Sequence, residues 1–407
     1  MAIDPEERKR QRLQRKQQQK ARQRKTVIKL ILAVVALVLC GLVIAWVIGL
    51  AGGSRRNSKD DTAPADTVIH VAAAGDLNVT QAVVASGGGE YDYTETLMDV
   101  APILAQADIA AINFEGNLYG APYGDDYSAP QTLVQGLDTA GVDLVQIANS
   151  YSIYKGIDGL SATVTGIRSA GMEPLGAYAS AAEARAAKGY TIRNVNGVKI
   201  AFVAFTKGMD SMALPAGSED CVNVLYTDYS TTYQQVDTQG ISKILDAVEK
   251  EKPDITVAML HWGSEFNDTI STSQDQICTL MQLKGVDAII GTHSHYVQQM
   301  VFDEAAGTFV AYSLGDFLGD ATRAGSEYSV ILDLEITKDG STGKVKITGY
   351  SYTPIFTEKQ ADGKLRVLRI DQAMAAFDAG YLGRVSQETY DAMAYALTRI
   401  EARIKGE

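Results

Sequence analysis

The sequence has 407 residues, enough for one large domain or two domains of ordinary size. Its hydrophobic content of 46% and charged content of 21% are typical of a chain that folds around a core, which excludes a protein that is disordered throughout. The net charge of −12 is unevenly spread, because residues 1–29 carry 11 Lys or Arg and three Asp or Glu. That tail has a net charge of +8 and leaves −20 on the remainder. An acidic body disfavours binding to nucleic acid or to anionic lipid.

Residues 30–51 follow the basic tail and form a run of 22 residues without a charge. A helix of that length spans roughly 33 Å, which covers a hydrocarbon core of about 30 Å. A buried core helix would show a polar face, and a cleaved signal peptide, the more serious alternative, has a shorter apolar run of ~7–15 residues. We expect an uncleaved single-pass anchor in the cell membrane, with the tail cytoplasmic and the acidic body outside. The tail is interpreted as a topology signal, although it could also touch RNA or anionic lipid.

Residues 52–67 are small and polar and contain Pro and Gly, which is typical of a linker. Short apolar runs then alternate with helical patterns, which favours an α/β fold with a buried sheet. Strands are expected at residues 68–74, 109–113, 142–147, 199–205, 255–260, 286–290 and 308–312, and antiparallel strands at 328–337 and 344–352. Helices are expected at residues 93–105, 129–140, 159–170, 180–188, 239–251, 273–284 and 386–405. We assign residues 68–355 to the main domain and 356–407 to a C-terminal helical extension.

Polar side chains follow most of these strands at the point where each strand ends. In α/β sheets, ligands bind beyond the carboxyl ends of the strands, so a single crevice could collect these side chains. They are Asp76, Asn113, Glu115, Asn149, Ser150, Tyr151, His261, Glu265, His293, His295 and Asp316. The set includes three of the four histidines in the chain. The fourth, His70, lies inside the first strand and is expected in the core or on the sheet surface.

The strand-end set combines carboxylates with imidazoles and contains no thiolate. That combination suits a borderline divalent metal such as Zn, Mn or Fe, whereas oxygen ligands alone would favour Mg or Ca. Taken singly, Asp76 could be a helix cap or turn residue, and His261 could be a buried histidine with satisfied hydrogen bonds. His293 and His295 are harder to explain in this way because they lie one residue apart.

Five motifs occur in a fixed order: "GD" at 75–76, "NFE" at 113–115, "HWGSE" at 261–265, "GTHSH" at 291–295 and "SLGDF" at 313–317. This order resembles the CapA-like poly-γ-glutamate capsule-synthesis proteins, which are similar to the calcineurin-like metallophosphatases. The resemblance runs from about residue 68 to about residue 320, so we expect a CapA-like domain within 68–355. It implies a metallophosphatase-like sandwich of two β-sheets flanked by helices, here preceded by one N-terminal transmembrane helix.

The resemblance also implies roles for individual residues. Metal ligands are implied at Asp76, Glu115, His261, His293 and His295. Positions that orient these ligands are implied at Asn113, Asn149, Glu265 and Asp316. Asn113 could also touch the metal, and Asp316 could instead be a simple turn acid after Gly315.

The third motif departs from the family pattern. The family usually reads A-N-N-H-x-x-D-x-G, whereas residues 148–156 read ANSYSIYKG, so Ser150, Tyr151 and Tyr154 replace Asn, His and Asp. The lost Asn would be a metal ligand and the lost His a general acid or charge stabiliser. A serine hydroxyl is a poor ligand for a hard divalent ion, and a phenol with a pKa of about 10 is a poor proton shuttle at pH 7. We therefore expect one tightly bound Mn, Fe or Zn ion and a weak or empty second position.

Three functions are compatible with these patterns. The first is a membrane-anchored extracellular hydrolase or transferase that acts on a phosphoester or amide in the synthesis or processing of a poly-γ-glutamate or capsule-type polymer. The second is a non-catalytic component that binds or assembles the polymer, and an anchored scaffold without a metal is a third. The expected partners are membrane lipid, an anionic surface polymer and other capsule-synthesis proteins, but no nucleic acid. Cys221 and Cys278 show no metal-type spacing and are expected to be free, although an oxidising space permits a disulfide.

Overall fold

The computed structural model describes residues 64–381 and 385–407. The basic tail, the apolar run at 30–51 and most of the linker lie outside the described residues, so the membrane anchor stays a prediction. Within the two described ranges, every helix is either too short or too polar to cross a bilayer.

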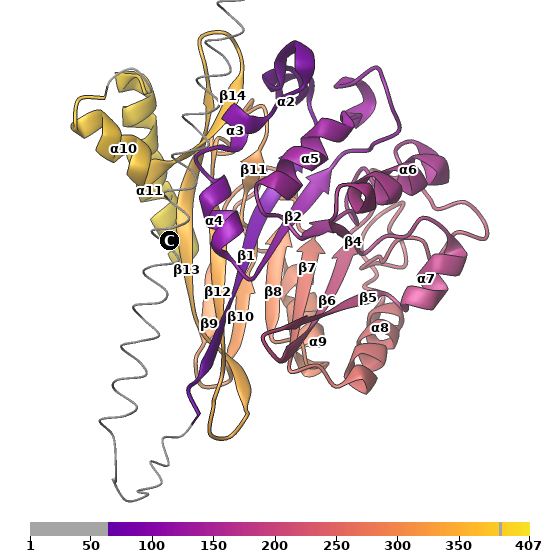
Figure 1. Ribbon diagram of the computed structural model, residues 1–407. Coiled ribbons are helices and arrows are strands. Elements are labelled where there is room, and N and C mark those ends of the chain that lie inside the picture. Colours follow the sequence, from indigo (N-terminus) through magenta and orange to yellow (C-terminus); the bar gives the residue numbers. More distant parts are fainter. Residues whose placement is uncertain (1–63, 382–384) are drawn as a thin grey trace, which may run out of the picture. The chain divides into compact units, whose positions relative to one another are not determined.

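The first β-sheet has eight strands and is parallel in one half and antiparallel in the other (Figure 1). From β1, the strands β2, β3 and β4 continue in parallel on one side, and β12, β13 and β14 continue antiparallel on the other. The short strand β11 also pairs with β1 in parallel. The strands are β1 (Thr67–Asn78), β2 (Ile109–Glu115), β3 (Leu144–Gln146), β4 (Glu173–Leu175), β11 (Asp316–Leu318), β12 (Tyr328–Lys338), β13 (Val345–Lys359) and β14 (Leu365–Arg369).

The second β-sheet has six strands in the order β5-β6-β7-β8-β10-β9. The four inner strands are parallel, and both edge strands pair antiparallel to their neighbours. The strands are β5 (Tyr190–Val195), β6 (Val198–Thr206), β7 (Ile255–His261), β8 (Ala288–Thr292), β9 (Met300–Asp303) and β10 (Thr308–Ala311). Parallel inner strands end at the same edge of the sheet, which is the edge where the sequence places its histidines.

The two sheets pack face to face. Side chains alternate between the two faces of each strand, so every second residue of a strand points into the space between the sheets. Ile69, Val71 and Ala73 of β1 share one buried cluster with residues of β6, β7 and β8, so this cluster fills the space between the sheets. Ala72 and Ala74 of β1 belong to a different cluster on the opposite face. The expectation of two sheets between helical layers is therefore confirmed for the described residues.

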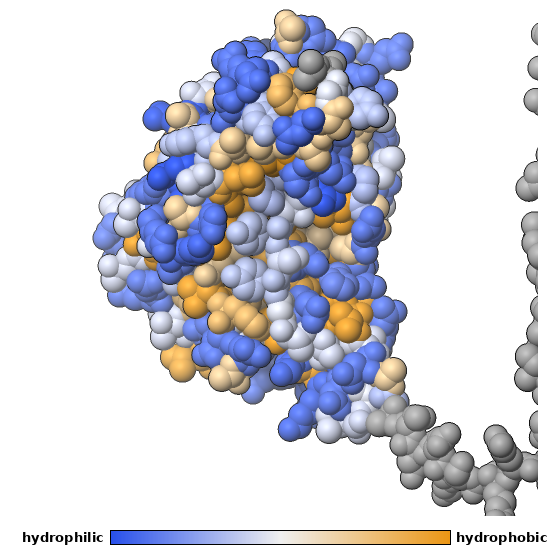
Figure 2. Space-filling view, turned by 90° about the vertical axis from the view of Figure 1, so that its left-hand side faces the viewer, coloured by the Kyte–Doolittle hydropathy of each residue, from blue (hydrophilic) through white to orange (hydrophobic). Residues whose placement is uncertain are grey.

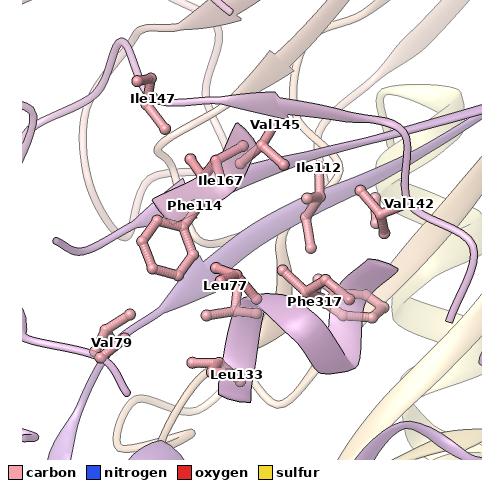
Figure 3. Packing of buried hydrophobic residues seen from close by; sticks show 14 of the residues in the cluster. Leu77, Val79, Ile112, Phe114, Leu133, Val142, Val145, Ile147, Ile167 and Phe317 are labelled. Carbon is pink, nitrogen blue, oxygen red and sulfur yellow. The ribbon is translucent and has the colours of Figure 1, made fainter. Parts of the chain in front are cut away.

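Helices cover the outer face of each sheet. The outer face of the first sheet is covered by α2 (Gln81–Ser86), α3 (Thr94–Leu97), α4 (Ala101–Gln106), α5 (Gln131–Thr139) and α6 (Gly156–Ser169). Figure 3 shows Leu77, Ile112 and Phe114 of this sheet beside Leu133 of α5 and Ile167 of α6. The second sheet is covered by α8 (Thr238–Glu251) and α9 (Thr272–Leu283), while α7 (Ala181–Ala187) precedes β5.

The helix expected at residues 93–105 is instead two short helices, α3 and α4. Pro102 lies in the first turn of α4. Backbone N–H groups in the first turn have no partner within the helix, so the N–H that proline lacks is not needed there. In the middle of a continuous helix the same residue would remove a hydrogen bond and clash with the preceding turn. The apolar pattern continued across the break, but the proline separates it into two elements.

The first sheet continues past residue 355, where the sequence suggested the end of the main domain. β13 ends at Lys359 and β14 follows in the same sheet, before α10 (Ile370–Asp378) and α11 (Gln387–Lys405). Residues Met393, Ala396 and Ile400 of α11 belong to the cluster between the sheets, so this helix is packed against the domain. Figure 2 shows the side on which α10 lies in Figure 1, where hydrophobic residues form separate patches among hydrophilic ones, as on a solvent-exposed face.

Candidate metal centre

The ends of β1, β2, β7 and β8 bring the strand-end residues together in the interior. Asp76 pairs in register with Asn113 across β1 and β2, and His261 pairs with Thr292 across β7 and β8. The side chains form two groups, each of which could hold a metal ion. These are Glu115 with His261 and His293, and Asp76 with His295 and Asp316, and in each group the ligand atoms lie within 4.8 Å of one another. All six side chains are buried.

The two groups are connected directly. The backbone N–H of His293 donates to Asp76 Oδ2 at 2.8 Å, and the His261 and His293 rings lie 4.3 Å apart. His261 Nδ1 also lies 3.2 Å from Glu115 Oε1. The six side chains of the two groups therefore form one continuous cluster. His70 lies apart on the sheet surface, where its Nδ1 lies 3.0 Å from Asp333 Oδ2.

Both histidines of the GTHSH motif have a left-handed backbone, with φ of +87° at His293 and +59° at His295. Such a conformation costs of order 1–3 kcal/mol for a non-glycine residue and persists only where its surroundings fix it. Hydrogen bonds fix it here, since Ser294 O accepts from Phe266 N at 2.8 Å and Asp76 accepts from His293 N. Backbone strain of this kind is concentrated at functional sites.

The glycines of the GD and SLGDF motifs are explained by a close approach of two backbones. A Cβ on Gly75 would lie 1.8 Å from the carbonyl oxygen of Gly315, so no larger residue fits. Gly315 has φ of +81°, which is favourable only for glycine. This contact permits the bond from Asp76 N to Gly315 O at 3.0 Å and places Asp76 beside Asp316.

Two amide side chains orient the carboxylates. Asn113 Nδ2 donates to Asp76 Oδ1 at 2.6 Å and lies 3.3 Å from Glu115 Oε1. Asn149 Nδ2 in turn donates to Asn113 Oδ1 at 3.1 Å and to the carbonyl of Phe114 at 2.7 Å. Because Asn149 occupies the Asn113 oxygen, the Asn113 amide faces the carboxylates with its N–H group. Asn113 and Asn149 thus connect the two carboxylates to β2 and to each other through hydrogen bonds.

Burial disfavours the charged forms of Asp76 and of the Glu115–His261–His293 group. It raises the pKa of Asp76 to about 6, and it raises the pKa of Glu115 well above its usual value with help from the nearby Asp76 carboxylate. Burial also holds the pKa values of His261 and His293 well below the usual value, so both imidazoles are neutral. Neutral imidazoles and ionised carboxylates are the forms that bind a divalent cation, so a bound cation would favour the ionised form of Glu115 that burial alone disfavours.

His295 behaves differently because Asp316 faces it. Burial acts to lower the pKa of His295, but the Asp316 carboxylate, 2.7 Å from Nδ1, outweighs it and the pKa rises to about 10. Phe266 stacks on the imidazole at 4.8 Å and Arg323 lies over Phe266 at 4.4 Å. Asp316 therefore holds His295 by this contact and is also a member of the second candidate ligand group.

The donor set fits a divalent cation. Three carboxylates and three imidazoles, without a thiolate, converge in a buried cluster. His293 Nδ1 is buried and has no hydrogen-bond partner among the described residues, which is costly for a polar atom unless a ligand satisfies it. Glu265 does not belong to either ligand group and lines a cavity beside them.

The residues that replace the family's third motif lie at the edge of this cluster. Ser150 Oγ is 3.1 Å from His261 Nε2, and Tyr151 stacks on Tyr127 with ring centroids 3.7 Å apart. Tyr154 contacts the same Tyr127 ring edge-on at 5.0 Å. Burial and the nearby Glu115 raise the pKa of Tyr151, so its phenol stays protonated at neutral pH. Tyr151 is therefore held by aromatic packing and is unsuited to proton transfer.

A cavity of about 300 Å³ opens beside the Glu115–His261–His293 group. Its lining includes Ser150 and His293 from the cluster, together with Lys207, Tyr233 and Glu265. Sequence reasoning missed Lys207, although the signal was present, since this residue directly follows β6. Cys221 and Cys278 are buried and free, and neither belongs to a candidate ligand group.

Comparisons with known proteins agree with the motif order. Residues 70–321 match the model of a family described as bacterial capsule synthesis protein PGA_cap. The chain is 26% identical over 250 residues to the capsule biosynthesis protein CapA of Bacillus anthracis, covering 60% of this chain and 58% of that protein. It is 27% identical over 259 residues to the PGA biosynthesis protein CapA of Bacillus subtilis (strain 168), covering 61% and 63%. The chain thus spans less than two thirds of the length of these curated relatives.

Among solved structures, the chain is similar to the calcineurin-like phosphoesterase YfkN from Bacillus subtilis. The identity is 14% and the TM-score 0.45, over 84% of this chain and 99% of that one. The family match covers more than half of the chain and contains every strand-end residue from Asp76 to Asp316. Because the family match covers more than half of the chain, the chain belongs to the PGA_cap family of bacterial capsule synthesis proteins.

Proposed function

We propose that this chain is a membrane-anchored CapA-like protein that acts outside the cytoplasm in the synthesis or processing of an anionic surface polymer of the poly-γ-glutamate or capsule type. The observation that carries the proposal is the buried cluster of three carboxylates and three imidazoles beside an open cavity. The names of the two CapA relatives supply the polymer class. Structural proteins rarely bury so many ionisable groups without a ligand to compensate them.

The proposed cofactor is one tightly bound Mn, Fe or Zn ion held by Glu115, His261 and His293. This group is favoured because His293 Nδ1 is unpartnered among the described residues. In the second group, by contrast, His295 Nδ1 is already satisfied by Asp316 at 2.7 Å, and a second ion would have to compete with that ion pair. When bound, a divalent ion supplies Lewis acidity toward a phosphoryl or carbonyl oxygen.

The residues of the site favour slow hydrolysis or transfer over rapid hydrolysis. Asn113 and Asn149 orient the ligands, and the cavity beside Ser150 admits a substrate group. Proton transfer by a general acid typically contributes ~10²–10⁴-fold, and the described site places a protonated phenol, Tyr151, where the family pattern has a histidine. A non-catalytic role in binding or assembling the polymer is therefore the second candidate, and it is favoured because Tyr151 stands where the family pattern has a histidine.

The proposed location rests on the sequence of the N-terminal region. A tail with a net charge of +8 precedes an uncharged run of 22 residues, which favours a cytoplasmic tail and an external domain. Membrane lipid around the anchor and other capsule-synthesis proteins are the proposed partners. A reporter that is active only outside the cytoplasm, fused after residue 407, should be active. Activity of a cytoplasmic reporter at the same position would overturn the topology.

Function is tested on the full-length protein in detergent. We expect about one equivalent of a divalent transition metal and slow turnover of poly-γ-glutamate or of a generic phosphodiester, abolished by Glu115→Gln. Metal binding with polymer binding but without turnover would establish the second candidate. Absence of both metal and polymer binding would overturn the proposal.

A further inference from the structure

The cavity beside the Glu115–His261–His293 group contains a single Lys or Arg among the described residues that line it. That residue is Lys207, which shares the lining with Ser150 and His293 of the metal centre. The lining also includes Asp210 and Glu265, so the cavity has carboxylates of its own. A lone cation in a polar cavity next to a metal site is a candidate for recognising a substrate group.

The position of Lys207 is fixed by contacts at both ends of the residue. Its backbone N–H donates to the carbonyl of His261 at 2.8 Å, directly at the metal centre. Its ammonium Nζ donates to the carbonyl of Gly263 at 2.7 Å and lies 4.8 Å from the centroid of the Tyr233 ring. An ammonium has three donors, so after the bond to Gly263 it still has hydrogen-bonding capacity for a ligand.

Lys207 has no carboxylate within ion-pair distance among the residues that the structure describes. Burial lowers the pKa of its ammonium, and the charge of Glu265 acts in the opposite direction. A partly buried ammonium without a direct counter-ion is stabilised by an anion that enters the cavity.

The turn after β6 is built to hold this residue in place. Thr206 Oγ1 donates to the carbonyl of Gly208 at 2.8 Å and accepts from the Gly208 N–H at 3.2 Å. Asp210 and Ser211 then adopt left-handed conformations, with φ of +47° and +63°. Two successive strained residues beside a cavity indicate a turn whose shape is fixed by its surroundings.

We propose that Lys207 binds a carboxylate of the substrate within this cavity, next to the Glu115–His261–His293 group. Lys207 carries one positive charge, which matches the single charge of a carboxylate, and Asp210 and Glu265 in the same lining repel a doubly charged phosphate more strongly. The inference rests on the proposed function, because it assigns the substrate class of the same site. It also explains how an acidic protein can take an anionic polymer, since the recognition is local.

The test uses full-length protein in detergent and two synthetic probes: a γ-linked glutamate oligomer with free α-carboxylates and the same oligomer with α-carboxamides. Binding is measured by titration calorimetry, and metal content is measured on the same samples. Lys207→Met should weaken binding of the carboxylate oligomer by ~10-fold or more, the effect typical of a charge-assisted hydrogen bond, and leave metal content unchanged. Lys207→Arg should restore most of the affinity. Lys243→Met, at an exposed lysine on α8, is the matched control and should bind as the parent does.

Three results would overturn the proposal. They are equal affinity of the parent and Lys207→Met for the carboxylate oligomer, equal affinity of the parent for the two oligomers, and competition by acetate that is equally strong in the parent and in Lys207→Met. If the parent binds metal but does not bind the carboxylate oligomer, the role of Lys207 is refuted and the metal centre is not. Lysine-dependent oligomer binding by a parent without metal would instead uphold the role of Lys207 and refute the proposed metal function.

Discussion

Replacing Asn149 with alanine should destabilise the protein more than any single surface change, because this side chain joins two buried hydrogen bonds and a third that is partly buried. Its Nδ2 donates to Asn113 Oδ1 at 3.1 Å and to the Phe114 carbonyl at 2.7 Å, and its Oδ1 accepts from Tyr151 N at 3.1 Å. Asn149 itself is 0% exposed, so water cannot replace the lost bonds without entering the core. The Asn113 and Phe114 oxygens would be left unsatisfied.

The expected loss follows from those two acceptors. A buried polar atom left without a partner costs about 1–3 kcal/mol, so Asn149→Ala should lower the free energy of unfolding by roughly 2–6 kcal/mol. The freed Asn113 amide would no longer hold Asp76 and Glu115, so metal affinity should also fall, by ~10–100-fold as for other residues that orient ligands.

The assay is urea unfolding of the parent and the variant, with metal affinity measured by competition with a chelator. Asn267→Ala is the matched control, because Asn267 is exposed and its Oδ1 accepts one local bond from Thr269 N. The control should change stability by less than about 0.5 kcal/mol. A change this small in Asn149→Ala, or an unchanged metal affinity, would refute the reasoning.

Three further perturbations follow. The double variant Ser150→Asn with Tyr151→His restores the family pattern and should raise metal occupancy and hydrolysis together; a variant that binds no more metal than the parent would contradict this. Burial raises the pKa of Asp287 to about 6, so the folded state keeps its proton longer than the unfolded state and stability should fall as pH rises from about 4 through about 6. At pH 7 the ionised Asp287 should cost roughly 3 kcal/mol in the free energy of unfolding, and Asp287→Asn should recover this amount in urea unfolding. If parent and variant show the same dependence of stability on pH, Asp287 does not cause it. Arg403 of α11 lies 4.6 Å from the ring centroid of Tyr296, so Arg403→Met should cost about 1–2 kcal/mol in thermal unfolding, whereas an unchanged Tm would show that the contact contributes nothing.

Much of the α/β architecture follows from the sequence, because long apolar strands and amphipathic helices carry a strong periodic signal. Strands β4, β5, β9, β11 and β14 were not predicted. They are three to six residues long, and β5 is only partly buried, so they lack a continuous apolar run. Their existence depends on pairing with neighbours that are distant in the sequence.

The candidate site could be predicted as a set of residues but not as an arrangement. Strand-end logic brought Asp76, Glu115 and the three histidines together, because parallel strands end at one edge. It did not show that Asp316 pairs in register with Asp76, since β11 is a three-residue strand. The left-handed backbone of the GTHSH motif could not be predicted from the sequence either, because it is imposed by tertiary hydrogen bonds.

The central claim is that the Glu115–His261–His293 group holds one divalent ion. The most direct measurement is the metal content of the full-length protein and of His293→Ala, by mass spectrometry after exhaustive dialysis. We predict about one equivalent of Mn, Fe or Zn in the parent and a large loss in the variant, together with a lower melting temperature, because the bound ion stabilises the folded state. A parent without metal, or a variant that keeps the metal content and melting temperature of its parent, would contradict the claim.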